Sequence, residues 1–306
     1  MDFSVTILGA NSAVPAHGRN QTCQVVTLGN QLYLVDCGES TQIQLRKYKV
    51  KFSKINNIFI SHLHGDHYLG LMGVISTFHL NRRKDPLTIF GPKGLDEIII
   101  AHLKHGNTKL NYPLKFIPTD PDKKSLLVDD NTHQVYSFPL KHRLPCTGFY
   151  FIEKPKPRNL VKEKLKDQKL SLEAIETLKS GKDFLDEEGN VLYPVEEFTY
   201  PPAPLRKYAF CSDTIYDPEL VPFIKGVDLL YHEATFMNDE AVRARETFHS
   251  TAAQAGAIAR AGKVKKLLLG HYSTRYSDLS PLLLEAQDIF PNSFLSVEGE
   301  SYCVSE

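Results

Sequence analysis

The segment Ser61-His62-Leu63-His64-Gly65-Asp66-His67 constrains the fold of this chain more than any other feature. It places three imidazoles and a carboxylate within six residues, directly after the apolar run INNIFIS, which is typical of a β-strand. These side chains can converge only if the backbone turns sharply after the strand, and Gly65 supplies the freedom for that turn. Imidazole and carboxylate are ligands of borderline cations such as zinc. The motif therefore predicts a metal site, and the alternative is a solvated polar loop.

Three further candidate ligands stand at the ends of apolar segments later in the chain. His142 ends VYSFPLKH, Asp213 ends KYAFCSD and His271 ends KKLLLGH, and each segment is typical of a strand. Layered α/β sheets place their sites at the carboxyl ends of strands, although a lone histidine or aspartate there is more often structural. With the motif they make seven ligands, enough for two metals that share one carboxylate: His62, His64, Asp66, His67, His142, Asp213 and His271.

Strands and helices alternate along most of the chain, which indicates the α/β class. FSVTILG and CQVVTLGNQLYLVDCGE are typical of strands, the second divided by a hairpin turn at Gly29-Asn30. Helices are expected at about 69–80, 94–105 and 250–261. We expect a single domain over residues 1–306 with an inserted arm at about 153–200.

The expected arm differs in composition from the rest of the chain. Prolines open and close it, lysine and glutamate are frequent, and its leucines recur at helical spacing. Between Lys154 and Lys169 seven basic and two acidic residues give a local charge of +5. This stretch is either a surface that contacts nucleic-acid phosphates or a merely solvated helix surface.

The whole chain is electrically neutral, with 36 basic and 36 acidic side chains. This balance argues against a uniformly basic surface that grips nucleic acid, but it leaves a local basic patch open. No apolar stretch approaches the roughly 20 residues of a membrane span, and the N-terminus has no signal-peptide pattern. The five cysteines are odd in number and lack CxxC spacing, so we expect a reduced, cytoplasmic protein.

The motif and its distant partners resemble the metallo-β-lactamase fold of hydrolases, a four-layer αββα sandwich. Further segments narrow the resemblance to the ribonuclease Z family of tRNA 3′-processing endoribonucleases, and HEATF with a downstream HST is the most specific of them. They run along nearly the whole chain outside the arm: ILGANSAVP, LVDCGE, FISHLHGDHYLGLMG, FGPKGL, KHRLPCTGF, FCSDT, HEATF, HST and LGHYSTRY.

The resemblance implies a zinc-dependent endoribonuclease that cleaves precursor tRNA 3′ of the discriminator nucleotide. A hydroxide held between two zinc ions would attack the phosphodiester and leave a tRNA 3′-hydroxyl. Asp66 would be the catalytic base as well as a ligand, and the family also implies a homodimer with a protruding, flexible arm. The implied ligands are His62, His64 and His142 for one zinc, Asp66, His67 and His271 for the other, and Asp213 bridging both.

Two residues outside the ligand set have implied catalytic roles. His249 would meet the scissile phosphate and neutralise charge or protonate the leaving oxygen. Glu233, in the HEATF segment, would orient His249 through a hydrogen bond. The alternative for residues 248–251 is a capping turn, with Ser250 or Thr251 at the N-terminus of a helix.

Five residues are implied to contact tRNA. Arg19 and Asn20 belong to an early loop that reads the tRNA 3′ region in the family, and His17 stands where the family has a lysine. That replacement leaves open whether precursors that carry CCA are accepted. In the basic stretch of the arm the implied contacts are Lys154, Lys156 and Arg158.

Two other functions are alternatives to RNA cleavage. A small-molecule phosphodiesterase or thioester hydrolase of the same fold would need no remote basic arm. A metal-bearing RNA-binding subunit without activity would not need an intact set of seven ligands. The arm, the HEATF–HST pair and the complete ligand set therefore favour the endoribonuclease.

Overall fold

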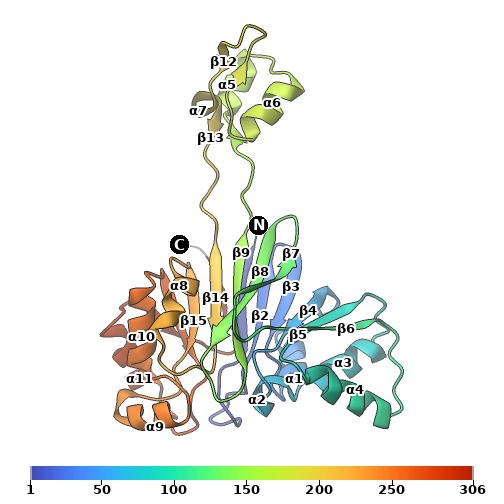
Figure 1. Ribbon diagram of the computed structural model, residues 1–306, viewed down its shortest axis with the longest axis vertical. Helices are drawn as coiled ribbons and strands as arrows, with labels where there is room; N and C mark the ends of the chain where they lie inside the picture. The colour runs from blue at the N-terminus through green and yellow to red at the C-terminus, as the bar shows by residue number, and fades with distance from the viewer. Residues whose placement is uncertain (1, 305–306) are drawn as a thin grey trace. The chain divides into compact units, whose positions relative to one another are not determined.

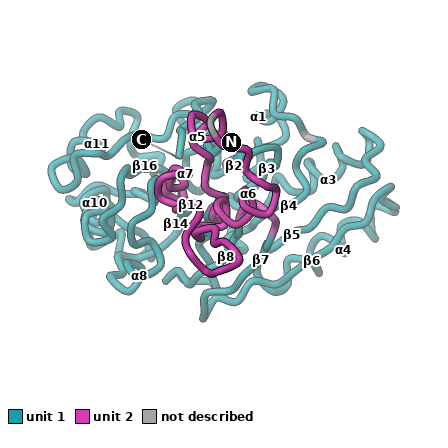
Figure 2. The backbone as a smooth tube through the Cα atoms, turned by 90° about the horizontal axis from the view of Figure 1, so that it is seen from above, with its two compact units in different colours: residues 1–129, 134–152, 206–306 teal, residues 130–133, 153–205 magenta. Residues whose placement is uncertain are grey.

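The computed structural model describes residues 2–304 and divides into two compact units. Unit 1 consists of Met1–Asp129, Gln134–Ile152 and Arg206–Glu306 (Figure 2). Unit 2 consists of Asp130–His133 and Glu153–Leu205. All seven candidate metal ligands belong to unit 1.

Unit 1 contains two seven-stranded sheets. In the first, β1 to β3 pair antiparallel and β3 to β6 pair parallel. The predicted hairpin between β2 and β3 is confirmed, with Gly29 at a φ of +58° that favours glycine. The spatial order is β18 (Ser301–Cys303), β1 (Phe3–Gly9), β2 (Cys23–Leu28), β3 (Gln31–Val35), β4 (Ile55–Phe59), β5 (Leu87–Gly91) and β6 (Leu114–Pro118).

In the second sheet β14 to β17 run parallel, and β14 pairs antiparallel with β9. Nearly every residue of the apolar runs in β15 and β16 is buried, as parallel strands covered on both faces require. The spatial order is β17 (Ser293–Leu295), β16 (Lys266–Gly270), β15 (Leu229–Glu233), β14 (Lys207–Cys211), β9 (Cys146–Glu153), β8 (His133–Leu140) and β7 (Ser125–Asp129).

Aromatic side chains join the two sheets into one core. Phe59 of β4 stacks on Phe90 of β5 with ring centroids 4.9 Å apart, and it meets Phe149 and Phe151 of β9 at 5.3 and 5.7 Å. Helices α1, α3 and α4 pack on the first sheet, and α10 and α11 pack on the second, so helices cover both outer faces (Figure 1). Unit 1 is therefore a four-layer αββα sandwich, which confirms the predicted fold class.

The long helices lie where the sequence predicts them. The regions at about 69–80, 94–105 and 250–261 contain α3, α4 and α10, and Thr251 caps α10 in a capping box with Gln254. The role predicted for Gly65 is wrong, because this residue begins α2 and has no positive φ. The α-helices of unit 1 are α1 (Thr41–Lys47), α2 (Gly65–Tyr68), α3 (Leu71–Leu80), α4 (Leu95–His105), α8 (Val221–Ile224), α9 (Ala241–Glu246), α10 (Ala252–Ala261) and α11 (Ser280–Gln287).

Unit 2 has a small folded structure of its own. Two short antiparallel pairs, β10 with β13 and β11 with β12, accompany its helices. Its buried side chains include Ala174, Leu178 and Phe198. Its elements are β10 (Asn159–Leu160), α5 (Lys162–Asp167), α6 (Leu172–Lys179), β11 (Phe184–Leu185), β12 (Val191–Tyr193), α7 (Val195–Phe198) and β13 (Thr199–Tyr200).

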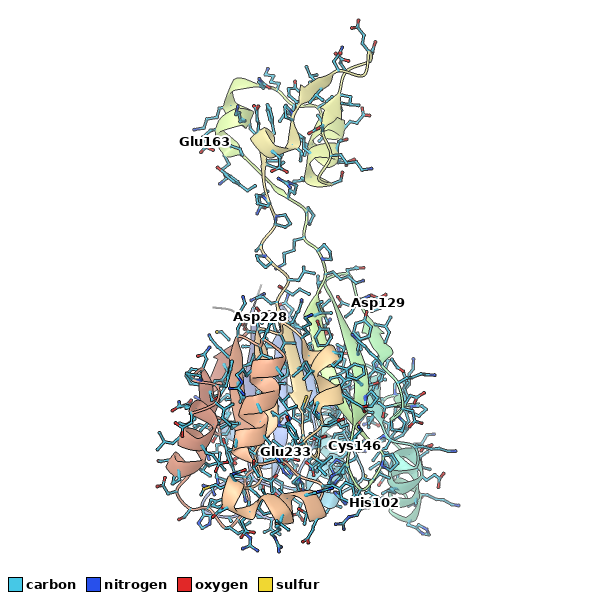
Figure 3. All side chains as sticks on the ribbon, turned by 60° about the vertical axis from the view of Figure 1, so that its left-hand side comes forward. His102, Asp129, Cys146, Glu163, Asp228 and Glu233 are labelled. Atoms are coloured by element: carbon cyan, nitrogen blue, oxygen red, sulfur yellow. The ribbon has the colours of Figure 1, made fainter. Side chains whose placement is uncertain are left out.

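Unit 1 buries a charged side chain and a thiol in its interior. Glu233 and Cys146 lie inside unit 1, whereas Glu163 lies on the surface of unit 2 (Figure 3). All five cysteines are free thiols. Between residues 2 and 304, no helix combines the length and the apolar character that a membrane span needs.

Candidate active site

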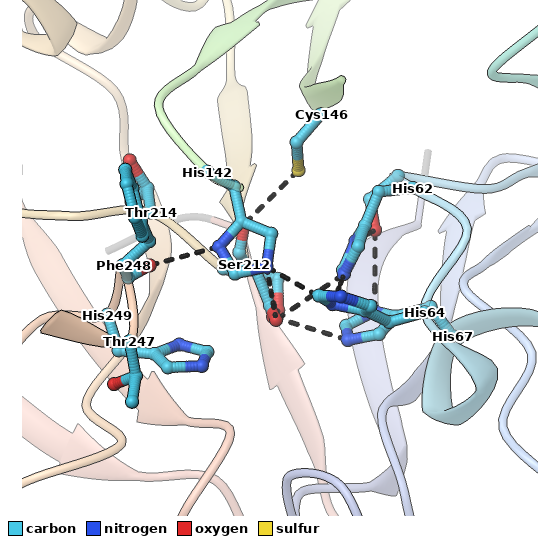
Figure 4. A network of polar contacts seen from close by, with 12 residues as sticks. His62, His64, His67, His142, Cys146, Ser212, Thr214, Thr247, Phe248 and His249 are labelled. Atoms are coloured by element: carbon cyan, nitrogen blue, oxygen red, sulfur yellow. Dashed lines mark hydrogen bonds and ion pairs between the residues drawn. The ribbon is translucent and has the colours of Figure 1, made fainter. Parts of the chain in front are cut away.

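The first part of the site is a group of three histidines, His62, His64 and His142, that point at one another (Figure 4). Asp213 completes the group. The Nδ1 of His64 lies 2.9 Å from the Nε2 of His62 and 3.1 Å from the Nε2 of His142. The Oδ2 of Asp213 lies 3.5 Å from the Nε2 of His62 and 3.7 Å from that of His142. A tetrahedral ion with metal–nitrogen bonds of about 2.0–2.1 Å keeps its ligand atoms about 3.3 Å apart. The four atoms therefore surround a space of the size that one metal ion needs.

A second group, formed by Asp66, His67 and His271, is joined to the first through Asp213. The Oδ2 of Asp66 is 3.4 Å from the Nε2 of His67 and 3.6 Å from the Nε2 of His271. The other oxygen of Asp213, Oδ1, is 3.2 Å from His67 and 3.0 Å from His271. One buried carboxylate thus directs one oxygen at each group.

Strand ends carry these side chains into the site. His62, His142, Asp213 and His271 follow the carboxyl ends of β4, β8, β14 and β16 within three residues. Asp213 and His271 have φ values of +49° and +58°, a left-handed conformation that aspartate and histidine adopt more readily than most residues. Such a conformation costs roughly 1–3 kcal/mol and persists where the surrounding structure enforces it. The fold therefore holds these two ligands in place against a local backbone cost.

A buried aspartate that follows β3 orients His67. The Oδ2 of Asp36 accepts a 2.6 Å hydrogen bond from the Nδ1–H of His67, and its carboxylate also accepts the N–H and hydroxyl of Ser61 at 2.8 and 2.9 Å. Because Nδ1 is engaged by Asp36, Nε2 is the nitrogen of His67 that faces the site and would bind a metal in place of a proton. Burial alone would lower the pKa of His67, but three carboxylates, Asp213 first, outweigh burial and raise it well above its ordinary range. The same negative field favours a metal cation.

Two further rings are fixed by partners outside the ligand set. The Nδ1–H of His142 donates to the carbonyl of Phe248 at 3.0 Å, and the Nδ1–H of His271 donates to the hydroxyl of Thr235 at 2.9 Å (Figure 4 shows the first bond). The hydroxyl of Thr235 donates in turn to Glu233 at 2.6 Å. Each partner fixes a ring orientation and leaves Nε2 turned toward the site.

The ligand nitrogens fit a cation chemically as well as geometrically. Within residues 2–304, the Nε2 atoms of His67 and His271 are buried without a hydrogen bond, which is costly unless an ion compensates. Burial lowers the pKa of the other three rings, which are therefore neutral at pH 7 and can offer a lone pair: His62, His64 and His142. This donor set suits divalent zinc, manganese, iron or cobalt.

Glu233 is a fully buried carboxylate whose oxygens are all engaged. Its Oε1 accepts the N–H of Thr214 at 2.7 Å and the Nδ1–H of His249 at 2.9 Å. Its Oε2 accepts the N–H of Ser250 at 3.1 Å and the hydroxyl of Thr235. One carboxylate therefore positions both His249 and, through Thr235, a metal-ligand ring.

His249 lies beside the metal ligands, and its Nε2 has no hydrogen bond to any of the described residues. Its ring centroid is 5.3 Å from those of His271 and His142, and its side chain is 16% exposed. Burial alone would lower the pKa of His249, but the Glu233 carboxylate raises it to about 9. His249 is therefore protonated at neutral pH and presents Nε2–H as a proton donor.

The site opens into a cavity of about 630 Å³. Ligands from both groups line it together with His249. Outside the ligand set its described lining carries arginines and no acid, which suits a substrate that bears phosphates. The arginines are Arg143, Arg243 and Arg275.

Arg19 and Asn20, which are predicted to contact tRNA, hold their own loop in place. The Nε of Arg19 donates to Asn11 at 3.0 Å and one of its terminal nitrogens to the carbonyl of Ser277 at 3.3 Å. The side-chain nitrogen Nδ2 of Asn20 donates to the Oε2 of Glu298 at 2.8 Å. Residues 12–14 of this loop line the cavity, so Arg19 and Asn20 shape its wall, and their contact with tRNA stays a prediction.

The three arm residues predicted to contact tRNA all belong to unit 2, where Lys154 follows directly on β9. The Nζ of Lys156 lies 2.8 Å from a carboxylate oxygen of Glu153. Arg158 donates to Thr199 at 2.6 Å and to Glu196 at 2.8 Å. Further lysines of the basic stretch are exposed on this unit: Lys162, Lys164, Lys166 and Lys169.

Sequence reasoning missed two residues that organise the site. Asp36 follows a predicted strand in LVDCGE, which is the same signal that identified Asp213, so it could have been found. Thr235 gives no such signal, because its role depends on a hydrogen bond with His271, which lies 36 residues further along the chain.

An αββα sandwich with histidine and aspartate ligands gathered at its strand ends defines a metal-dependent hydrolase of the metallo-β-lactamase fold. The family model described as anti-Pycsar protein Apyc1 matches residues 3–118. Human tRNase Z, short form, has a similar structure, with a TM-score of 0.72, 26% identity, and coverage of 99% of this chain and 100% of that chain. The Bacillus subtilis metallo-β-lactamase fold protein YhfI shares the fold at a TM-score of 0.70, 19% identity, and coverage of 99% of each chain.

Curated relatives narrow the class to one family. Ribonuclease Z of Parabacteroides distasonis is 46% identical over 298 residues, which cover 97% of this chain and 98% of the relative. Ribonuclease Z of Cytophaga hutchinsonii is 47% identical over 306 residues, which cover 100% of this chain and 97% of the relative. The chain belongs to the ribonuclease Z family.

Replacing Thr235 with valine should weaken metal binding. Valine keeps the volume, but the Nδ1–H of His271 loses its acceptor and Glu233 loses a donor. Loss of such an outer partner costs roughly 10–100-fold in metal affinity. Competition with a chromophoric chelator, on purified apoprotein, measures the change.

Thr235→Ser is the matched control, because it keeps the hydroxyl and should bind metal almost as tightly as the unaltered protein. Thermal unfolding of the metal-free variants checks that the fold is retained. Equal affinities for Thr235→Val and the unaltered protein would contradict the role given to Thr235.

Proposed function

We propose that this chain is an endoribonuclease that cleaves precursor tRNA on the 3′ side of the discriminator nucleotide and releases the 3′ trailer. One observation carries the proposal. A chain that is 46% identical to a ribonuclease Z over 97% of its length has a complete pair of ligand groups joined by Asp213.

We propose zinc, two ions per chain, as the metal. When bound, two such cations lower the pKa of a shared water to near neutrality and neutralise charge on the phosphate. The donor types and the two-sided carboxylate of Asp213 support this assignment. Asp66 would hold one ion and also accept the proton of the attacking water. The ligands would be His62, His64 and His142 for one ion, and Asp66, His67 and His271 for the other, with Asp213 shared.

The bond that breaks joins phosphorus to the 3′-oxygen of the tRNA, because the product carries a 3′-hydroxyl. That oxygen needs a proton as it leaves, and the protonated Nε2 of His249 would supply it. The 2.9 Å bond from His249 to Glu233 supports this role, because it holds the ring and keeps it charged. His249 would also neutralise charge on the phosphate before the proton moves.

We propose that unit 2 contacts the tRNA away from the bond that breaks. The exposed lysines of its basic stretch support this, since each lysine that neutralises a phosphate releases a counterion. Lys154, Lys156 and Arg158 would join them. A homodimer and a cytoplasmic location complete the proposal, and both rest on the family resemblance.

Incubation of the purified protein with 5′-labelled precursor tRNA tests the activity. We expect one product of mature length, and extension by poly(A) polymerase would report its 3′-hydroxyl. A chelator should abolish cleavage and added zinc should restore it. Hydrolysis of bis(p-nitrophenyl) phosphate without a discrete tRNA product would overturn the proposal.

Glu233→Gln should shift the pH profile of cleavage. In the unaltered protein His249 stays protonated until the pH passes about 9, so cleavage should fall on the alkaline side of that value. Without the carboxylate the pKa of His249 moves toward or below its ordinary value of about 6.5, and the fall should begin at least about one pH unit lower. Single-turnover rates from pH 6 to 10 measure this, and an unmoved alkaline limb would contradict it.

Replacing Lys162, Lys164, Lys166 and Lys169 together with glutamine should weaken tRNA binding. If all four contact phosphates, the slope of log K against log salt should fall by about 3–4. Hydrolysis of bis(p-nitrophenyl) phosphate should not change, because a small diester has no remote phosphates. An unchanged salt slope, or equal losses on both substrates, would contradict the assignment.

A further inference from the structure

A second cavity shares His249 with the catalytic cavity. It has a volume of about 520 Å³, within the range of roughly 300–1,000 Å³ that is typical of ligand sites. Arg243 and Thr247 line the catalytic cavity, whereas Val242 and Arg245 line the second one. Helix α9 and the turn after it therefore separate the two cavities, and the imidazole of His249 is common to both.

The second cavity offers an exposed aromatic ring and an exposed guanidinium. Tyr216 is 40% exposed and Arg245 is exposed, and neither side chain has a hydrogen bond or ion pair with any residue of the described chain. The nearby acids Asp217 and Glu219 are paired with Lys141, at 3.1 and 2.5 Å. The charge of Arg245 is therefore available to an anion.

An aromatic ring beside an unpaired arginine is the combination that binds single nucleotides of RNA. The ring stacks on a base of any kind, and the guanidinium contacts a phosphate. Val242, which is 75% exposed, adds apolar surface to the same cavity. The chemistry of the lining thus points to a nucleotide as its ligand.

The position of His249 indicates which nucleotide of the substrate the second cavity binds. Cleavage breaks the bond between phosphorus and the 3′-oxygen, so the phosphorus stays with the trailer and the proton of His249 goes to the tRNA. The nucleotide that bears the departing oxygen must therefore reach His249, and the second cavity begins there. We propose that this cavity binds the discriminator nucleotide, with its base on Tyr216 and its 5′-phosphate at Arg245. The proposal rests on the proposed function of the site.

Tyr216→Ala tests the stacking. It should lower kcat/KM for precursor tRNA by on the order of 10- to 100-fold, the usual loss when one stacked base loses its ring. Tyr216→Phe keeps the ring and should cleave almost normally. Both variants should hydrolyse bis(p-nitrophenyl) phosphate at the unaltered rate, because that diester has no discriminator base.

A precursor with an abasic discriminator site identifies the partner of the ring. On this substrate Tyr216→Ala and the unaltered protein should cleave at the same rate, since the base that stacks is gone. If Tyr216→Ala lowers kcat/KM by the same factor on the abasic substrate as on the normal precursor, the proposal is overturned. It is also overturned if the Tyr216→Ala variant cleaves the normal precursor at full rate.

Arg245→Ala tests the phosphate contact. It should reduce the slope of log K against log salt by about one, and Arg260→Ala, on the exposed face of α10, is the matched control and should leave the slope unchanged. Equal slopes for both variants would overturn this part of the proposal. Failure of the unaltered protein to cleave precursor tRNA would instead refute the proposed function, so the two failures are distinguishable.

Discussion

The carboxylate of Asp213 is the constraint on which the rest of the site depends. Its two oxygens lie 3.0–3.7 Å from four imidazole nitrogens. Three of these rings follow strand ends of both sheets, and the fourth, His67, lies in α2. Burial alone would raise the pKa of Asp213, but the surrounding histidines, His271 first, hold it well below its ordinary range. The aspartate therefore stays anionic inside the protein. Both sheets must end at one point for this to happen, and the aromatic core between them fixes that alignment.

Two other buried acids, Asp36 and Glu233, orient histidines of the site. A buried carboxylate is costly unless hydrogen bonds compensate it, and both Asp36 and Glu233 are compensated by backbone N–H groups as well as by a histidine. Asp36 holds His67 directly, and its partner Ser61 has its hydroxyl 3.0 Å from the Nδ1 of His62. Glu233 serves His249 directly and His271 through Thr235, so the acid for the leaving oxygen and a metal ligand share one anchor. The positions of the proton donor His249 and the metal ligand His271 are therefore fixed relative to each other.

The alternation of strands and helices was sufficient to predict the α/β class, whereas the αββα sandwich followed from the family resemblance. The His/Asp motif and three strand ends supplied the seven ligand candidates that the structure brings together. These signals are local, because a run such as INNIFIS indicates its own strand and the residue that follows it. The hydrogen bonds of Thr235 and the inward-facing contacts of Arg19 are set by packing between distant segments, which one sequence does not reveal. Gly65 shows the opposite error, since a glycine in a motif suggested a special turn where the structure has an ordinary helix start.

The chain has no net charge, but its acidic and basic side chains lie in different places. The acids of the site are engaged by histidines and backbone N–H groups, whereas Arg143, Arg243 and Arg245 face cavities without an ion pair among the described residues. Positive charge is therefore concentrated where a polyanion would lie, although the total is zero. His249 lies where two of these cavities meet, and its anchor Glu233 is fully buried. A substrate that spans both cavities must pass its reacting bond beside this imidazole, so the partition by α9 selects which oxygen receives the proton.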